Sequence, residues 1–167
     1  MQVHSFAPVA TAACSVLVLG SMPGKASLRA QQYYAHRQNQ FWRLMGSLLG
    51  FEPSAPYEER LQNLLRRGVG LWDVLQTCTR VSSLDSDIVE SSSVPNDFVT
   101  FFSEHPRVST VFFNGAKAAS SFAKLVAPTL PPTLALQLRR LPSTSPANAS
   151  ISYERKLSEW SSVVRAA

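Results

Sequence analysis

The stretch Ser15–Leu19, with the sequence SVLVL, is closed by Gly20 and decides the fold class of this chain. A continuous run of aliphatic and β-branched residues bounded by glycine is typical of a strand that is buried on both faces. Such strands belong to parallel sheets that helices cover on both sides. The run therefore predicts an α/β protein.

Apolar runs and amphipathic stretches alternate along the rest of the chain, as in a parallel sheet with connecting helices. We expect three more strands, at Val69–Leu75, Thr110–Phe113 and Leu134–Leu141. The expected helices are Phe41–Leu49, Tyr57–Arg67, Pro95–Glu104, Ala116–Val126 and Ser152–Val164. The side chains expected on the outer face of the last helix are Glu154, Lys156, Glu159 and Arg165.

Polar segments separate these elements. The serine-rich stretch Val81–Val94 is expected to be a long surface loop, and Pro128–Pro132 a linker. Four strands with their helices predict a three-layer α/β/α architecture with a central four-stranded parallel sheet. We expect a single domain over residues 1–167, with a core over about residues 15–164.

The composition limits the class of protein. Hydrophobic residues make up 45% of the chain, and no apolar run approaches the roughly 20 residues of a membrane span, which excludes disorder and predicts no spanning helix. Cys14 and Cys78 are too few for a disulfide framework or a zinc cage, and no secretory signal is recognisable. A cytoplasmic protein is therefore expected, and its net charge of +5 suits a polyanion such as nucleic acid.

Ligands of open α/β sheets bind beyond the carboxyl ends of the strands. Four segments directly follow the predicted strands, and we expect the functional residues there. These segments are Gly20–Leu28, Asp73–Ser83, Asn114–Ala118 and Pro142–Ser150.

The segment LGSMPGKASL, residues 19–28, is a glycine-bearing turn between a strand and a helix, where main-chain N–H groups can face an anion. It is not a nucleotide P-loop. Gly20 and Gly24 enclose three residues instead of four, and Ala26 follows Lys25 where a magnesium-binding hydroxyl is required. A plain strand-to-helix turn without a ligand explains the same residues.

The segment QQYYAHRQNQFW, residues 31–42, places two tyrosines and basic residues just before a helix. Aromatic rings beside basic residues suit stacking on nucleobases. A purely structural explanation stays open for two residues. Asn39 stands at or near the N-cap of the helix that begins at Phe41, and His36 could cap or support the loop.

The segment RRLPSTSPANAS, residues 139–150, carries hydroxyl and amide side chains beyond the last strand, with two arginines upstream. Serine, threonine and asparagine are common contacts of DNA phosphates. A proline-rich surface loop without a ligand is the alternative explanation.

Five motifs, taken in order, resemble the uracil-DNA glycosylase superfamily: LGSMPG, YYAHRQNQFW, GLWDVL, VFFNG and LPSTSPANA. The resemblance runs from Val16 to Val164 and is closest to the hypoxanthine (deoxyinosine) DNA glycosylase branch, then to the mismatch-specific uracil-DNA glycosylases. It implies a uracil-DNA glycosylase-like fold, whose four-stranded parallel sheet agrees with the periodicity. It also implies a monofunctional enzyme that hydrolyses the N-glycosidic bond of a flipped, deaminated base in DNA.

The first loop departs from the mismatch-specific pattern. Relatives of that branch carry an asparagine there that positions the attacking water, whereas this chain has Met22, whose thioether cannot orient a water. In the hypoxanthine branch the asparagine of the second motif is thought to take this role, which implies Asn39 as the catalytic side chain here. The main-chain N–H groups of Ser21 and Met22 are then expected to face the departing base.

The resemblance also implies the rest of the site. The expected base-binding residues are Gly20, Pro23, Tyr33, Tyr34, His36, Phe41 and Asn114, with a tyrosine as the main stacking ring. The expected DNA-binding residues are Lys25, Ser143, Thr144, Ser145 and Asn148. Further candidates for phosphate contacts, by position alone, are Arg29, Arg37, Arg139 and Arg140.

The predicted function is excision of hypoxanthine, with uracil as the next base, from double- or single-stranded DNA by a monomer without cofactor or metal. Lys25 could attack the sugar as a lyase nucleophile, but the resemblance points to a monofunctional enzyme. Asp73 could act as a base, but we expect it to hold a loop or a cap, because a carboxylate repels DNA phosphates. The alternatives are an inactive nucleic-acid-binding module, suggested by Met22, and a hydrolase of small phosphorylated or acyl substrates, suggested by fold analogy alone.

Overall fold

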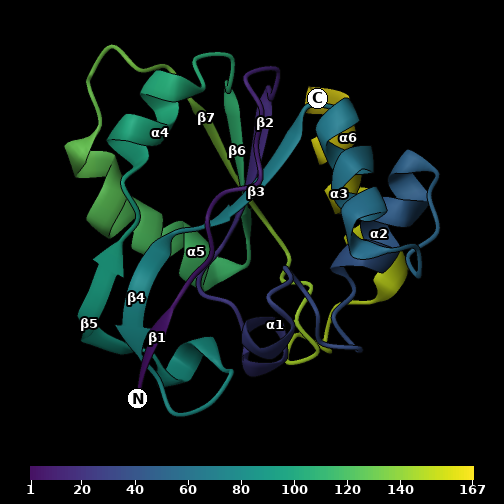
Figure 1. The fold of residues 1–167 in the computed structure, drawn as a ribbon, viewed down its shortest axis with the longest axis horizontal. Helices are drawn as coiled ribbons and strands as arrows, with labels where there is room; N and C mark the ends of the chain where they lie inside the picture. Colours follow the sequence, from purple (N-terminus) through teal and green to yellow (C-terminus); the bar gives the residue numbers. More distant parts are fainter.

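The centre of the molecule is a parallel sheet of four strands, as the computed structural model of residues Met1–Ala167 shows (Figure 1). The strands are β2 (Val16–Gly20), β3 (Val69–Asp73), β6 (Thr110–Asn114) and β7 (Gln137–Leu141). Their order is β3-β2-β6-β7, and every neighbouring pair is parallel. The predicted α/β fold with a four-stranded parallel sheet is confirmed.

Helices cover both faces of this sheet because the side chains of β2 alternate between two cores. Val16 and Val18 pack with the α2, α3 and α6 side, whereas Leu17 and Leu19 pack with the α4 and α5 side. The helices are α1 (Lys25–Ala30), α2 (Phe41–Leu49), α3 (Tyr57–Arg66), α4 (Phe98–Glu104), α5 (Ala116–Ser121) and α6 (Tyr153–Ala166). None of them is both long and apolar enough to cross a membrane.

Some element boundaries differ from the prediction for local reasons. The α4 helix begins at Phe98 because the side chain of Asp97 accepts a hydrogen bond from the Thr100 N–H and caps it. After Ser121 the α5 helix continues as a π-helical turn, η2 (Phe122–Val126), followed by the 3₁₀ turn η3 (Ala127–Thr129). The last strand starts only at Gln137, because the preceding prolines lie in a turn.

A second sheet was not predicted. It is antiparallel, with the order β1-β4-β5, and its strands are β1 (Gln2–His4), β4 (Leu75–Thr79) and β5 (Val89–Pro95). The strand expected over residues 69–75 therefore ends at Asp73, and the chain crosses at Val74 into this second sheet.

The long surface loop expected over residues 81–94 is wrong in its second half. This stretch contains a short 3₁₀ helix, η1 (Asp85–Asp87), and most of β5. Most side chains of β5 are exposed or half-buried on both faces, so the strand lacks the apolar alternation that sequence patterns detect.

Candidate active site

A cavity of about 690 Å³ lies at the carboxyl ends of the parallel strands. Its lining comes from the segments that follow β2, β6 and β7, from Asp73 at the end of β3, from the loop before α2, and from residues 83–86, which follow β4. The register of the sheet brings these segments to one level, because Gly20 pairs with Asp73 and Asn114 pairs with Leu141. The cavity therefore lies where the strand order predicts a ligand.

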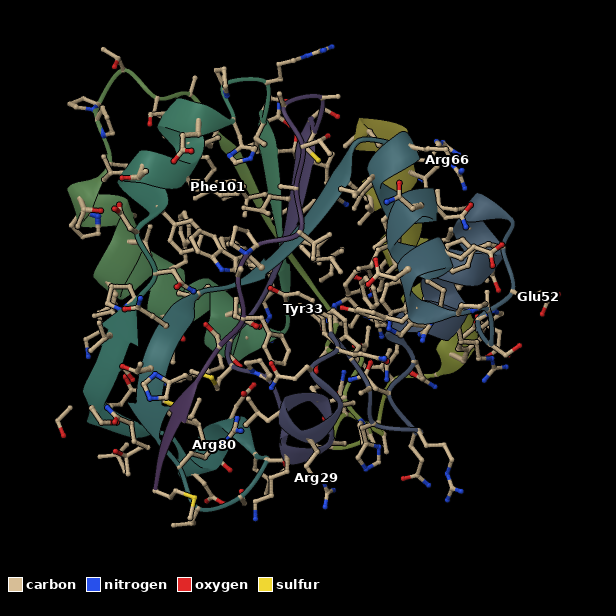
Figure 2. All side chains as sticks on the ribbon, in the orientation of Figure 1. Arg29, Tyr33, Glu52, Arg66, Arg80 and Phe101 are labelled. Carbon is tan, nitrogen blue, oxygen red and sulfur yellow. The ribbon has the colours of Figure 1, made fainter.

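The cavity brings together nearly all of the predicted site residues. Those that line it are Gly20, Ser21, Met22, Pro23, Lys25, Tyr33, Tyr34, His36, Asn39, Asn114, Ser143, Thr144, Ser145 and Asn148. Phe41 is the exception. Of the four arginine candidates, only Arg140 lines the cavity, and Arg29 points away from the protein at the end of α1 (Figure 2).

Asn39 is half-buried at the cavity, and its two side-chain atoms are in different situations. Its Oδ1 accepts a hydrogen bond from the Phe41 N–H at 3.0 Å, which fixes the side chain at the start of α2. Its Nδ2 donates to no protein group, although the residue lines the cavity. The structural and functional explanations of Asn39 are therefore compatible: one atom anchors the residue and the other is free for a ligand.

The aromatic residues of the second motif differ in burial, so only some of them can contact a ligand. Phe41 is fully buried and cannot stack on a base, which corrects its assignment as a base-binding ring. It instead supports Tyr34, whose ring stacks on it with centroids 4.1 Å apart. Tyr33 is 3% exposed, and its hydroxyl donates to the Ala7 carbonyl, so Tyr34 is the stronger candidate for ring contact. Figure 2 places Tyr33 in the interior, where the sheet meets the loops.

The first loop, which follows β2, has main-chain N–H groups at the cavity that the protein leaves unpaired. The N–H groups of Ser21 and Met22 donate to no main-chain carbonyl. The Met22 side chain belongs to the hydrophobic core, so it takes no part in placing a water. These observations fit the expectation that this loop contributes main-chain dipoles.

Two side chains hold this first loop in place: Asp85, in the stretch expected to be a long surface loop, and Arg80, directly before that stretch. Ser21 Oγ donates to Asp85 Oδ1 at 2.5 Å, and Arg80 Nη2 donates to the Pro23 carbonyl at 2.6 Å. Arg80 is 2% exposed and lies beside α1 at the end of the antiparallel sheet (Figure 2). Asp85 was not predicted because it lies in a serine-rich stretch without periodicity. Arg80 falls in the segment Asp73–Ser83, where functional residues were expected, but nothing in the sequence singled it out.

Asp73 ends β3 and is 3% exposed, with its carboxyl at the cavity. Burial, and secondly the Asp85 carboxylate, raise the pKa of Asp73 to about 7, while the Arg80 guanidinium acts in the opposite direction. The expected role in holding a loop is wrong for the carboxyl, whose Oδ2 has no hydrogen-bond partner. Only the main-chain carbonyl of Asp73 makes such a contact, with Asn96 Nδ2 at 2.8 Å.

A hydrogen-bond network joins the loops on the other side of the cavity. Asn114 and Thr144 form two hydrogen bonds, each 2.9 Å long. Asn114 Nδ2 donates to Thr144 Oγ1, and the Thr144 N–H donates to Asn114 Oδ1. The Thr144 carbonyl accepts from the Gln40 N–H at 3.0 Å. Lys156 Nζ then donates to Gln40 Oε1 at 2.9 Å and to the Asn148 carbonyl at 2.8 Å.

This network corrects two predictions. The fully buried Thr144 side chain positions a loop and cannot reach DNA. Lys156 is not on an outer face, because it is 2% exposed, and burial lowers the pKa of its ammonium. Its position between other charged residues of α6 gave no signal of this role.

Several polar groups of the loop after β7 form hydrogen bonds within the loop itself. Ser143 Oγ accepts from the Ser145 N–H, and Ser145 Oγ accepts from the Ala147 N–H, both at 3.2 Å. Asn148 Nδ2 donates to the Ser143 carbonyl at 3.0 Å. These bonds fix the shape of a loop that borders the cavity, and its contact with DNA stays a prediction.

The fold and the cavity define a class of protein: an α/β protein with a cavity lined by polar groups at the carboxyl edge of its parallel sheet. The lining offers an amide, main-chain N–H groups, hydroxyls and one buried carboxyl. No three His, Cys, Asp or Glu side chains lie close enough together to hold a metal ion. The polar groups of the lining can form hydrogen bonds with a ligand and stabilise charge on it.

Comparison with known families identifies this class more closely. The family model described as "Uracil DNA glycosylase superfamily" matches residues 8–165. The chain belongs to this superfamily and is a DNA glycosylase. The resemblance stated from the five motifs is confirmed.

Individual relatives support the assignment. A protein of Methanosarcina barkeri named hypoxanthine DNA glycosylase is 39% identical over 119 residues, which cover 71% of this chain and 74% of the relative. A protein of the same name from Methanosarcina acetivorans is 36% identical over 151 residues, 90% of each chain. The solution NMR structure of a Methanosarcina acetivorans protein, described as a candidate uracil DNA glycosylase, matches with a TM-score of 0.81 and 35% identity, over 99% of this chain and 98% of that one.

Proposed function

We propose that this DNA glycosylase excises hypoxanthine, and secondarily uracil, from DNA by a monofunctional hydrolytic reaction. The observation that carries the proposal is the position of Asn39: its Nδ2 is unpaired at the cavity, while Met22 is packed in the core. This is the arrangement that the hypoxanthine branch implies and the mismatch-specific branch does not. The names of the two Methanosarcina relatives support the same base.

The proposed reaction begins with a nucleotide rotated out of the DNA stack, which costs a few kcal/mol and less for a mispaired base. As the glycosidic bond breaks, positive charge develops on the sugar and negative charge on the base. The N–H groups of Ser21 and Met22 stabilise that negative charge as fixed dipoles. Asn39 Nδ2 orients the attacking water or contacts the base, so no covalent nucleophile is needed.

DNA is held, in this proposal, by the basic residues around the cavity. Lys25 and His36 line it and are exposed, and Arg140 lines it from the end of β7. The Ser143–Asn148 loop borders the same opening and offers main-chain and hydroxyl groups to phosphates. A monomer presents all of these groups, so we propose that one chain acts alone on single- or double-stranded DNA.

An assay with lesion-bearing oligonucleotides tests this function. Oligonucleotides with a single deoxyinosine or deoxyuridine are incubated with the protein, and the strands are separated before and after alkali. We expect alkali-dependent cleavage at deoxyinosine, because a monofunctional enzyme leaves an intact abasic strand. Cleavage without alkali would indicate a lyase that uses Lys25. Binding without any cleavage of either lesion would contradict the proposal and favour an inactive DNA-binding module.

Replacing Gly20 with alanine is expected to lower excision about tenfold or more without unfolding the protein. A methyl group on Gly20 would lie 2.6 Å from Asp73 Oδ1 and 3.3 Å from the Tyr34 hydroxyl oxygen, so the Asp73 carboxyl must shift and the Tyr34 side chain must give slightly. Gly24→Ala is the matched control in the same loop, because its methyl group would meet Ser83 at an ordinary 3.5 Å. Equal excision rates for the two variants would show that the spacing around Gly20 is not needed.

A further inference from the structure

Two buried polar groups at the cavity make no hydrogen bond of ordinary length and angle within the protein, although the Asn114 side chain is near enough to the Tyr34 hydroxyl to act on its pKa. They are Oδ2 of Asp73 and the hydroxyl oxygen of Tyr34, and both residues line the cavity. A buried polar atom without a partner costs free energy, which a ligand recovers if it supplies that partner. The two atoms therefore indicate where a bound molecule makes hydrogen bonds.

The side chains of both residues lie close to Gly20: a Cβ added there would be 2.6 Å from Asp73 Oδ1 and 3.3 Å from the Tyr34 hydroxyl oxygen. Asp73 is held by the pairing of β3 with β2, opposite Gly20 itself. Tyr34 is held by its stacking on the buried ring of Phe41. The backbone of Asp73 and the ring of Tyr34 are thus held in position before any ligand binds, as a recognition site requires.

The surroundings of Asp73 favour a neutral carboxylic acid over a wide pH range. Burial contributes most, the Asp85 carboxylate adds to it, and only the Arg80 guanidinium favours ionisation, so that the pKa is raised to about 7. The remaining titratable groups that face this carboxyl are Tyr33, Tyr34 and Tyr57. Burial is the largest cause that raises the pKa of each of these hydroxyls, so all three stay protonated. The Tyr34 hydroxyl therefore keeps its hydrogen and can donate it to a ligand.

We propose that Asp73, as a neutral acid, binds the edge of the extruded base: its O–H donates to the carbonyl oxygen that deamination creates, and its other oxygen accepts from the neighbouring ring N–H. The Tyr34 hydroxyl supplies a second donor at the same edge. This assignment rests on the proposed function, because it needs a deaminated base in the cavity. It makes Asp73 a residue for both base recognition and catalysis.

The chemistry of deaminated bases explains why the neutral form matters. Deamination replaces an exocyclic amino group with a carbonyl and leaves a hydrogen on the adjacent ring nitrogen, so the edge presents an acceptor beside a donor. A carboxylic acid matches both groups, whereas a carboxylate repels the carbonyl oxygen. Negative charge spreads onto this oxygen as the base departs, so the hydrogen bond from Asp73 strengthens in the transition state. The proton stays on Asp73 throughout, and no bond to the protein forms.

Single-turnover excision of deoxyinosine between pH 5.5 and 9 tests the inference in three proteins. We expect the wild-type rate to fall with rising pH, with a midpoint at or above 7, because a bound base favours the neutral acid. Asp73→Asn keeps one donor and one acceptor at every pH, so its rate should stay within about tenfold of the wild-type rate at low pH and lose the decline. Asp73→Ala should be about 10²- to 10³-fold slower throughout.

A neighbouring pair of variants checks the electrostatic argument. Asp85→Asn removes the negative charge that faces Asp73 and should move the wild-type midpoint to lower pH. Asp87→Asn lies in the same turn η1 but does not act on Asp73, so the midpoint should stay unchanged. These measurements remain decisive even if Asp73→Ala fails to fold.

The outcomes separate the two proposals. If the wild-type protein excises neither deoxyinosine nor deoxyuridine, the proposed function is wrong. If it excises deoxyinosine and Asp73→Asn follows the wild-type pH profile, the role of Asp73 is wrong and the function stands. A wild-type rate that rises through pH 7 would assign Asp73 the opposite role, as an ionised base, and would also overturn the inference.

Discussion

Asn39→Ala should excise deoxyinosine at least about 10²-fold more slowly than the wild-type protein. The unpaired Nδ2 of Asn39 is the side-chain donor that the first loop cannot provide, because Met22 is packed in the core. The rest of the DNA-binding surface is unchanged in this variant. Affinity for an oligonucleotide, measured by fluorescence anisotropy, should therefore change by less than about tenfold.

The structural contribution of Asn39 can be measured separately. Alanine also removes the cap on the Phe41 N–H and should lower the free energy of unfolding by about 1 kcal/mol. Asn39→Asp keeps an oxygen for that cap but has no N–H, so it should retain stability and still lose excision. Gln38→Ala is the control, because Gln38 is an exposed neighbour outside the cavity. Loss of activity only in proportion to loss of stability would contradict a catalytic role for Asn39.

Asp73→Asn should stabilise the folded protein, and the gain should grow with pH. The pKa of Asp73 is raised from 3.8 to about 7 on folding, so the folded state holds a proton that the unfolded state has released. The free energy of unfolding therefore falls between about pH 4 and pH 7 and changes no further above this range. Removing the titration should give the variant an advantage that increases by on the order of 3 kcal/mol between pH 5 and pH 8.

Urea unfolding of both proteins at several pH values measures this difference. Asp97→Asn is the appropriate control, because hydrogen bonds from Thr100 lower the pKa of this exposed carboxyl. A group with a lowered pKa adds stability that is lost only as pH falls below the range tested, so the control should run parallel to wild type from pH 5 to 8. Parallel curves for wild type and Asp73→Asn would show that Asp73 is ionised when folded.

The parallel sheet and much of the cavity could be predicted because their signals are local. The run at Ser15–Leu19 specifies a strand by its own composition, and the loop that must follow it contains Gly20. Asn39 could be found because its motif lies in one uninterrupted segment before α2. In each case the sequence pattern that predicts the strand or the site lies within the same short segment that forms it.

The missed features depend on partners that lie far away in the chain. Arg80 is 57 residues from the Pro23 carbonyl that it contacts, and its burial is visible only when the second sheet is in place. In the sequence Asp73 looks like any other acidic residue at the end of a strand. Its burial, which raises its pKa, appears only in the folded structure. A sequence pattern contains neither the burial nor the empty hydrogen-bonding positions that give Asp73 its chemistry.

The ammonium group of Lys156 has a consequence for how the enzyme matures. It joins Gln40, 116 residues earlier, to the Asn148 carbonyl, and it lies on α6, which follows every residue of the cavity lining in the chain. A nascent chain that has reached only Ile151 already contains every residue of the cavity lining but not this link. The loop before α2 and the loop after β7 are therefore tied together only when α6 has docked beside them.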